Sequence, residues 1–142
     1  MSDAIVKLHA AQQHAADMRP AAGGFPVLAE VLRQAGVHRN EWSLPGAQSL
    51  YLTDAGPVMQ QGQPLVTGTV DVPPFDQDSL IKALRTDQAG HSTFSEFLLA
   101  TWNAGVVRYV ADFDAREVTY YGSDGSNYVE AYPPVTVEPA AS

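Results

Sequence analysis

The sequence repeats itself at an offset of 69 residues, and this internal duplication constrains the fold more than any other feature. When Phe25 is aligned with Phe94 (94 − 25 = 69), the two segments match without a gap, at glycines and at positions typical of a core. The paired residues are Leu28 with Phe97, Ala35-Gly36-Val37 with Ala104-Gly105-Val106, Arg39 with Arg108, Leu44 with Phe113, Tyr51 with Tyr120 and Gly56 with Gly125. We therefore expect two copies of one structural unit.

The first copy is expected to form two helices followed by three strands. Apolar residues at helical spacing predict a helix over residues 3–18, and Pro26 suits the first turn of the next helix. Gly36 stands where a left-handed helix end is favoured. Turn residues and alternating apolar residues predict strands over residues 37–44, 48–53 and 65–72, with a polar loop over 60–63.

The second copy repeats this plan with stronger local signals. Asp76 is a typical N-cap residue, and Thr93 with Glu96 forms the capping-box pattern that opens a helix. Gly90 and Gly105 are expected to end the two helices. Strands are predicted over residues 106–113, 117–121 and 128–132.

These elements predict an α+β fold made of internally duplicated ααβββ units, with the helices packed on antiparallel sheet. We expect a single domain over residues 1–136, divided into halves of about 3–72 and 73–136, and a flexible C-terminal tail over 137–142. Pseudo-twofold symmetry would bring the two hairpins together or place them at opposite edges, and the sequence favours neither. A cleft between the units would be the natural ligand site.

Composition excludes several classes of function. The chain has no cysteine, which excludes disulfides, thiolate metal sites and a cysteine nucleophile. Eight Lys and Arg against sixteen Asp and Glu give a net charge of −8, which argues against nucleic acid and anionic membranes as partners. No apolar run approaches the roughly 18 residues of a membrane span, and the start of the sequence lacks the pattern of a secretory signal. We therefore expect a cytoplasmic protein.

Residues 82–132 carry a pattern that resembles a known family. A helix ends at Gln88-Ala89-Gly90, an aromatic-led helix runs into "AGV", a hairpin returns through "TYYG", and "DG" and "YP" follow. The pattern resembles the YbcV-like bacterial proteins, a family of unknown function often labelled "phage envelope protein". The resemblance implies an α+β fold, and it implies no established activity, substrate or catalytic residues.

The residues that carry common catalytic or metal chemistry do not form organised sets. Asp112, Asp114 and Glu117 surround one predicted turn, where acidic residues favour the turn and solvate a sheet edge. The four histidines lack the spacing of a ligand pair, and no serine stands in a nucleophile elbow. We assign no catalytic residue, no metal site and no cofactor, and the sequence favours a non-enzymatic protein.

Tyrosines are concentrated near the end of the chain. Five of the six lie between Tyr109 and Tyr132. Adjacent Tyr120 and Tyr121 must point to opposite faces of a strand, so at least one of them should lie off the helix-covered core. An aromatic face is typical of protein interfaces and stacking pockets, and it also stabilises ordinary sheets. The candidate binding residues are Trp42, Arg108, Asp112, Tyr120, Tyr121, Tyr128 and Tyr132.

Three functions remain open at this point. The first is a binding or interaction domain whose aromatic sheet face takes a protein partner or a second copy of the chain. The alternative is a small-molecule enzyme or sensor with a pocket between the repeats, in which Trp42, Arg108, Asp112 and Tyr120 would be the nearest candidates. A phage-associated structural role is the weakest, because it rests on the family label alone.

Overall fold

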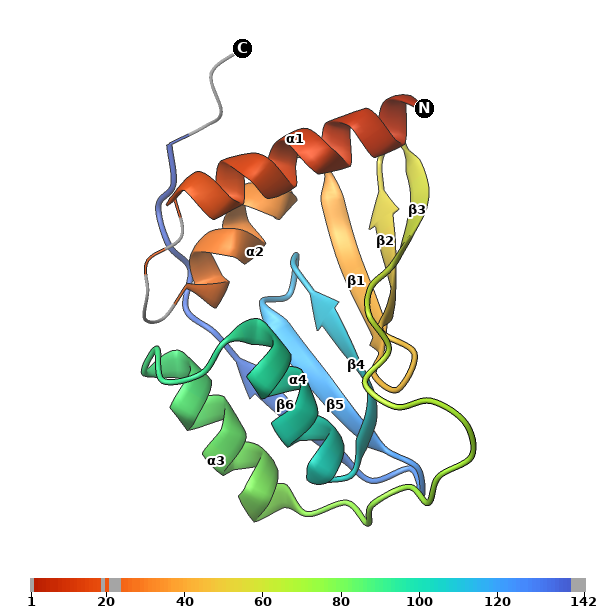
Figure 1. The fold of residues 1–142 in the computed structure, drawn as a ribbon. Helices are drawn as coiled ribbons and strands as arrows, with labels where there is room; N and C mark the ends of the chain where they lie inside the picture. Colours follow the sequence, from red (N-terminus) through yellow and green to blue (C-terminus); the bar gives the residue numbers. More distant parts are fainter. Residues whose placement is uncertain (1, 19, 21–23, 139–142) are drawn as a thin grey trace.

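The computed structural model describes residues 2–18, 20 and 24–138 of the chain (Figure 1). The elements of the first half are α1 (Asp3–Met18), α2 (Phe25–Gln34), β1 (Val37–Ser43), β2 (Gln48–Thr53) and β3 (Gly56–Gln61). Those of the second half are α3 (Gln77–Gln88), α4 (Phe94–Asn103), β4 (Val106–Asp112), β5 (Glu117–Gly122) and β6 (Asn127–Ala131). The predicted α+β class and the repeated ααβββ order are confirmed.

The duplication extends to the backbone conformation of equivalent residues. The helices α2 and α4 begin 69 residues apart (94 − 25), as do β1 and β4 (106 − 37) and β2 and β5 (117 − 48). Positive φ angles recur at the same offset, in Gly36 and Gly105 after the helices and in Ala47 and Arg116 within the hairpins. Two diverged sequences thus form the same turns.

The two halves share one antiparallel sheet with the strand order β3-β2-β1-β4-β5-β6. The strands β1 and β4 pair at the centre, where Glu41 faces Val110, its own equivalent (110 − 41 = 69). A pseudo-twofold axis therefore passes between these two residues. The symmetry places the first strand of each half at the seam and the last strand of each half at an edge.

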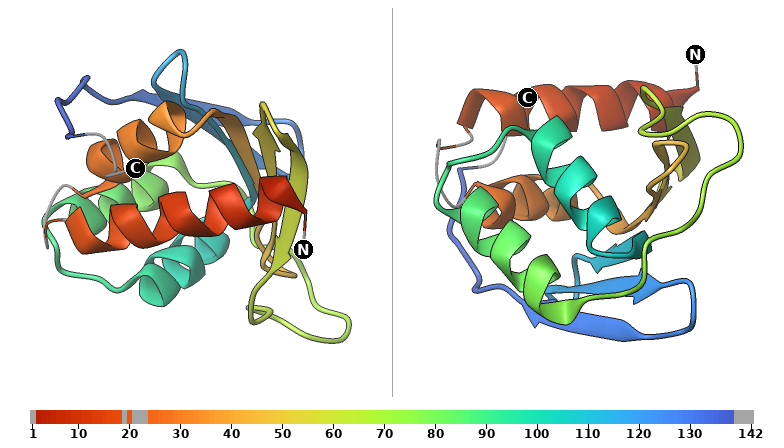
Figure 2. Two further views of the ribbon diagram at one scale, coloured as in Figure 1. Left: turned by 90° about the horizontal axis from the view of Figure 1, so that it is seen from above. Right: turned by 60° about the horizontal axis from the view of Figure 1, so that its bottom comes forward.

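The helices of the described chain all cover one face of this sheet and leave the other face open (Figure 2). Within each half the two helices pack against each other, with α2 on β1 and α4 on β4. None of the described helices is long and apolar enough to cross a membrane.

Local signals explain how the second-half helices begin and end. The Asp76 carboxylate accepts a hydrogen bond from the Ser79 amide at 3.2 Å, and Thr93 and Glu96 form the predicted capping box. Gly105 has a φ of 88°, and a Cβ there would collide with the backbone of Pro74. Only glycine therefore fits this junction, which locks the linker before α3 against the end of α4.

The third strand of the first half differs from the prediction. It is β3, at Gly56–Gln61, whereas residues 65–72 form no regular strand. The alternating Val70 and Val72 are 49% and 44% exposed, so their pattern has no partner strand or core to bury it. A tight turn from Thr53 to Gly56 instead returns the chain directly along β2. The expected polar loop at residues 60–63 is in part the solvent-facing end of this edge strand.

Residues 137 and 138, which the sequence assigns to a flexible tail, contact the helices of the first half. Val137 is buried against Ala15 and Val31, and its carbonyl accepts a hydrogen bond from the Gln34 side chain at 3.1 Å. The Glu138 carbonyl lies 3.2 Å from the ring of His14. These contacts bind the end of the chain to α1 and α2, and residues 139–142 lie outside the described residues.

Candidate ligand-binding site

A cavity of about 630 Å³ lies between the helix layer and the sheet. Its walls come from both halves, because α1, α2, β1 and β2 contribute on one side and α3, α4, β4, β5, β6 and the segment after β6 on the other. Its main apolar lining residues are Phe25, Leu28, Leu32, Trp42, Tyr51, Leu84, Phe94, Phe97, Tyr109, Phe113, Val118 and Tyr132. Its polar lining residues are Gln12, Asn40, Arg85, Asp87, Gln88, Ser92 and Glu130.

The cavity lies on the pseudo-twofold axis of the molecule. Both members of three equivalent pairs line it, at the offset of 69 residues that relates the halves. These pairs are Phe25 with Phe94, Leu28 with Phe97 and Asn40 with Tyr109. The cavity is thus enclosed by the meeting of the two copies, and neither copy could form it alone.

Aromatic rings pack against one another along its walls. Trp42 stacks on Tyr109, with ring centres 6.1 Å apart, and meets the edge of Phe94 at 5.4 Å. Across the cavity Phe25 makes an edge-on contact with Tyr132 at 5.1 Å. In the two edge contacts a phenylalanine that begins a helix of one half reaches an aromatic residue of the other half. Such contacts fix the rings at defined positions.

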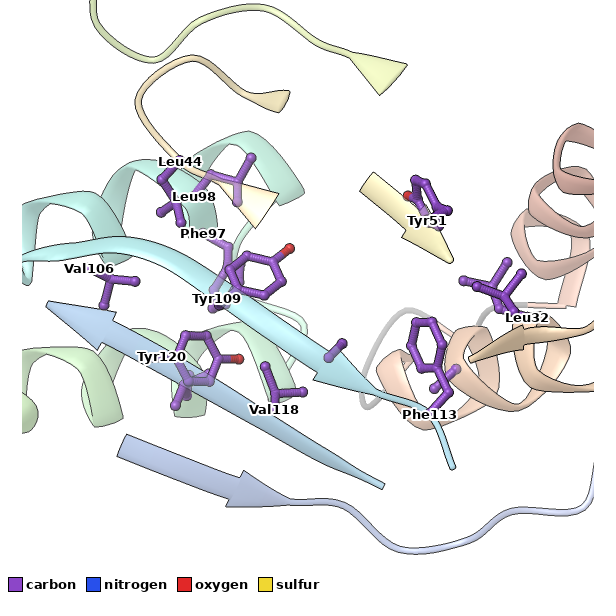
Figure 3. Close-up of a cluster of buried hydrophobic side chains, with 14 of the residues drawn as sticks. Leu32, Leu44, Tyr51, Phe97, Leu98, Val106, Tyr109, Phe113, Val118 and Tyr120 are labelled. Atoms are coloured by element: carbon purple, nitrogen blue, oxygen red, sulfur yellow. The ribbon is translucent and has the colours of Figure 1, made fainter. Parts of the chain in front are cut away.

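Figure 3 shows two groups of buried side chains with a space between them. Leu32, Tyr51 and Phe113 lie on one side, and Tyr109 and Tyr120 lie on the other. The hydroxyl oxygens of Tyr51 and Tyr109 are turned toward this space, so the aromatic walls also present polar groups to it.

The first half supplies neutral polar groups. The Gln12 side chain exchanges hydrogen bonds of 2.9 and 3.1 Å with Gln60, which ties α1 to the edge strand β3. Asn40, buried on β1, donates to the Leu50 carbonyl at 3.3 Å. Burial raises the pKa of Tyr51, and hydrogen bonds with Ser49 and Gln12 oppose that shift. Tyr51 is therefore a neutral hydroxyl at physiological pH.

The second half supplies an ion pair at the corresponding place. Arg85 on α3 donates through Nη1 to Glu130 Oε1 on β6 at 2.5 Å. The second oxygen of Glu130 accepts from Gln88 at 3.1 Å, and Arg85 also donates to the Gln88 side-chain oxygen at 2.9 Å. The hydrogen bond to Glu130 raises the pKa of Arg85. In each half, side-chain contacts thus link the first helix to the last strand. The contacts are hydrogen bonds between amides in the first half and an ion pair in the second.

Tyr120 and Tyr132 of the second half have raised pKa values. Burial raises the pKa of Tyr120 far above its ordinary value, and the charges of Glu130 and Asp87 add to the effect. Burial raises the pKa of Tyr132 to about 12. Both hydroxyls stay protonated at physiological pH, so they act as neutral hydrogen-bonding groups and not as bases.

Comparison with known proteins places the chain in a family. The model of a family described as "Protein of unknown function (DUF1398)" matches residues 13–130, which is 118 of the 142 residues (130 − 13 + 1). The chain belongs to the DUF1398 family. It is also 53% identical over 140 residues to the uncharacterised proteins Mb2035 of Mycobacterium bovis and Rv2012 of Mycobacterium tuberculosis. The match covers 99% of this chain and 84% of each relative.

In this DUF1398 member, the candidate binding residues chosen from the sequence lie on both faces of the sheet. Trp42 and Tyr132 line the cavity, and Tyr120 packs beside Tyr109 on the same helix-covered face. Tyr128 pairs with Tyr120 across β5 and β6, so it lies on that face as well. The expectation that Tyr120 and Tyr121 point to opposite faces is confirmed.

The other three candidates lie on the open face. The Arg108 guanidinium lies 3.8 Å from the ring centre of Tyr121, and Asp112 is 3.9 Å from the guanidinium of Arg39. The structure therefore does not bring Arg108 and Asp112 together with Trp42 and Tyr120. Alternation along a strand would have shown this separation once the helix-covered face was known.

Asp112, at the start of the β4–β5 turn, and Asp124, in the β5–β6 turn, have structural partners. Asp112 accepts hydrogen bonds from the amides of Asp114 and Ala115, and Asp124 accepts one from Ser126. Within the described residues no group of three His, Asp or Glu side chains is arranged to hold a metal ion. These acids shape their turns.

Sequence reasoning missed most of the cavity residues. Phe25 and Phe94 had been aligned only as the start of the repeat, although their shared position at a helix start was a usable signal. Gln12, Asn40 and Arg85 carried no motif at all, because residues from separate helices and strands converge there only in the fold.

Proposed function

We propose that this protein binds a small molecule in the cavity between its two halves, which was the alternative function suggested by the sequence. The observation that carries the proposal is a cavity of about 630 Å³ on the pseudo-twofold axis, lined by aromatic residues and a few convergent polar groups. Small-molecule sites usually measure about 300–1,000 Å³ and have this mixture of walls. Because both halves supply walls, the duplication itself would create the binding site.

The position of the tyrosines favours this function over the protein interface expected first. Tyr109, Tyr120, Tyr128 and Tyr132 lie on the helix-covered side, and Tyr121 alone of this group lies on the open face, beneath Arg108. The aromatic concentration therefore supports a pocket better than an exposed docking face. Homodimerisation, a protein partner, a cytoplasmic location and the YbcV-like or phage-related label stay predictions.

Binding rather than catalysis is the function that the lining supports. Arg85 and Glu130 neutralise each other, and the raised pKa values of Tyr51 and Tyr132 keep those two hydroxyls neutral. General acid–base catalysis needs a group whose pKa lies near the working pH and that reaches the reacting atom. The lining favours a sensor or carrier, in which the ligand is bound and released unchanged.

Replacing one cavity wall tests the proposal against a matched control. Phe94 and Leu99 are 45% and 47% exposed on the same helix, but only Phe94 lines the cavity. The neutral dye Nile red should bind the wild type with a rise in fluorescence and should quench Trp42 in a Trp102→Phe background. Phe94→Ala should weaken binding about tenfold, because the dye loses an aromatic contact, whereas Leu99→Ala should leave it unchanged.

Two results would count against the function. If Nile red and a metabolite library neither bind nor raise the melting temperature of the wild type, the cavity is not a ligand site. Equal weakening by Phe94→Ala and Leu99→Ala would place the dye on the surface of α4 instead of in the cavity.

A further inference from the structure

Asn40 is a polar residue at a position where strands usually carry an apolar one. It lies on β1, at the centre of the sheet, and is only 5% exposed. Asparagine is uncommon inside strands, and burial of a carboxamide is costly unless hydrogen bonds satisfy it. The equivalent residue of the second half is Tyr109 (109 − 40 = 69), so the fold itself does not require an asparagine here.

The hydrogen-bonding groups of the Asn40 side chain are only partly used. Nδ2 donates to the Leu50 carbonyl at 3.3 Å, and within the described part of the chain Oδ1 accepts no hydrogen bond. Every fully enclosed side-chain oxygen or nitrogen of the described residues has a partner, so Oδ1 is not enclosed by protein. Because Asn40 lines the cavity, Oδ1 offers a hydrogen-bond acceptor to its interior.

Tyr51 places a second polar group beside this acceptor. Asn40 and Tyr51 pair across β1 and β2, so their side chains are neighbours on the helix-covered face, where both line the cavity. The Tyr51 hydroxyl is turned toward the open space (Figure 3). Burial raises the pKa of Tyr51, and hydrogen bonds with Ser49 and Gln12 lower it, as bonds donated to the phenol oxygen do. The oxygen therefore accepts, and its own proton is left to be donated to a ligand.

An acceptor beside a donor matches a ligand with the opposite arrangement. Such a ligand would donate to Asn40 Oδ1 and accept from the Tyr51 hydroxyl. The N–H and carbonyl groups of a cyclic amide, or lactam, stand side by side in this way. Trp42 lies two residues along β1 from Asn40, on the same face, and also lines the cavity. Aromatic walls of this kind favour a flat ring system, which packs against them with a large contact area.

We infer that the ligand is a heteroaromatic lactam, a flat ring system whose edge carries an uncharged N–H group beside a carbonyl group. This inference rests on the proposed function and names the class of ligand. The N–H group donates to Asn40 Oδ1, the carbonyl oxygen accepts from Tyr51, and the ring packs against the wall that includes Trp42. Asn40 selects the ligand, because a ring without an N–H group leaves its oxygen unpaired in a closed site.

Two probes that differ by one methyl group test this inference on the wild type. Isocarbostyril is a flat lactam, and N-methylisocarbostyril keeps the ring and the carbonyl group but lacks the N–H donor. Isothermal titration calorimetry should show that isocarbostyril binds at least about tenfold more tightly, because its methyl derivative cannot donate to Oδ1. Nile red, which has no N–H or O–H group, reports on the pocket itself.

Substitutions assign the preference to its residues. Asn40→Leu removes the acceptor with little change in size, so it should reduce the preference to less than about twofold while Nile red still binds. Asn127→Leu, at an exposed position of β6 that does not line the cavity, is the matched control and should keep the preference. Tyr51→Phe should weaken both probes about fivefold and leave their ratio unchanged, because both carry the carbonyl group. Tyr121→Phe, on the open face, should weaken neither.

The outcomes separate the class of ligand from the proposed function. Equal affinities of the two probes for the wild type, no binding of either, or a preference that persists in folded Asn40→Leu would overturn the lactam while Nile red binding still supports the pocket. Absence of binding by Nile red and by both probes would overturn the proposed function itself. Circular dichroism should show cooperative unfolding of each variant. If Asn40→Leu does not fold, the comparison of the two probes on the wild type and on Tyr51→Phe still decides.

Discussion

His38 links two turns that belong to different halves of the molecule. One ring nitrogen lies 2.6 Å from Asp54 in the β2–β3 turn, and the other lies 2.8 Å from Asp114 in the β4–β5 turn. The His38 carbonyl also accepts a hydrogen bond from the amide of Phe113. The residue stands at the β1 bulge, where the register shifts between Val37 and Arg39, so it can reach both turns.

This contact predicts how stability changes with pH. Hydrogen bonds to Asp54 and Asp114 raise the pKa of His38 above its ordinary value of 6.5. Because the pKa of His38 is raised in the folded state, its contacts contribute fully to the free energy of unfolding below the pKa of the unfolded state. That contribution is lost as the pH rises through the pKa of the folded state. Between pH 6 and 9 the melting temperature of the wild type should therefore fall more than that of His38→Gln. His9→Gln, at an exposed position of α1, should follow the wild type, and parallel curves for all three would refute the link.

We expect a glycine-to-alanine substitution to lower the free energy of unfolding by different amounts at Gly105 and at Gly125. Both have a positive φ, but a Cβ at Gly105 would collide with Pro74, whereas one at Gly125 meets nothing within 4 Å. Gly125→Ala should cost about 1–2 kcal/mol for the left-handed backbone alone, and Gly105→Ala should cost clearly more. Urea unfolding of the two variants measures the difference, and equal losses would show that the linker moves aside without cost.

At the scale of the elements, periodicity and caps predicted most of the secondary structure. The Thr93 capping box, the helix over residues 3–18 and the strand over 48–53 all lie where their local signals place them. The strand predicted over 65–72 failed because alternation indicates a strand only where a neighbour is present to pair with it. The edge of β2 is occupied by β3, which follows β2 through a four-residue turn.

The candidate site was predicted less well than the elements, for a physical reason. Trp42 and Tyr132 were chosen from the sequence because aromatic side chains are typical of binding sites, and both line the cavity. Asp112 and Arg108 were grouped with them although they occupy the opposite face of the sheet. The side of a sheet that helices cover is decided by the packing of the whole chain, and a single strand does not reveal it.

At the scale of the whole molecule, duplication explains both the sheet and the cavity. Pairing β1 with β4 joins two three-stranded units into one sheet and sets Glu41 opposite Val110 on the axis. The two helix pairs then cover the same face, and the cavity lies between these helices and the sheet. The equivalent lining positions have diverged, as in Leu28 and Phe97 or Asn40 and Tyr109. A symmetric fold thus encloses a chemically asymmetric site.

Filling the cavity tests this account most directly. Leu28→Trp places an indole ring at a lining position whose equivalent, Phe97, is already aromatic. Leu99→Trp is the control, because it adds the same ring to an exposed position that does not line the cavity. The measurement is the affinity of Nile red for each variant, with cooperative unfolding as the check of the fold. We predict a loss of at least about tenfold for Leu28→Trp and no change for Leu99→Trp. Unchanged affinity in a folded Leu28→Trp variant would contradict a binding site between the two halves.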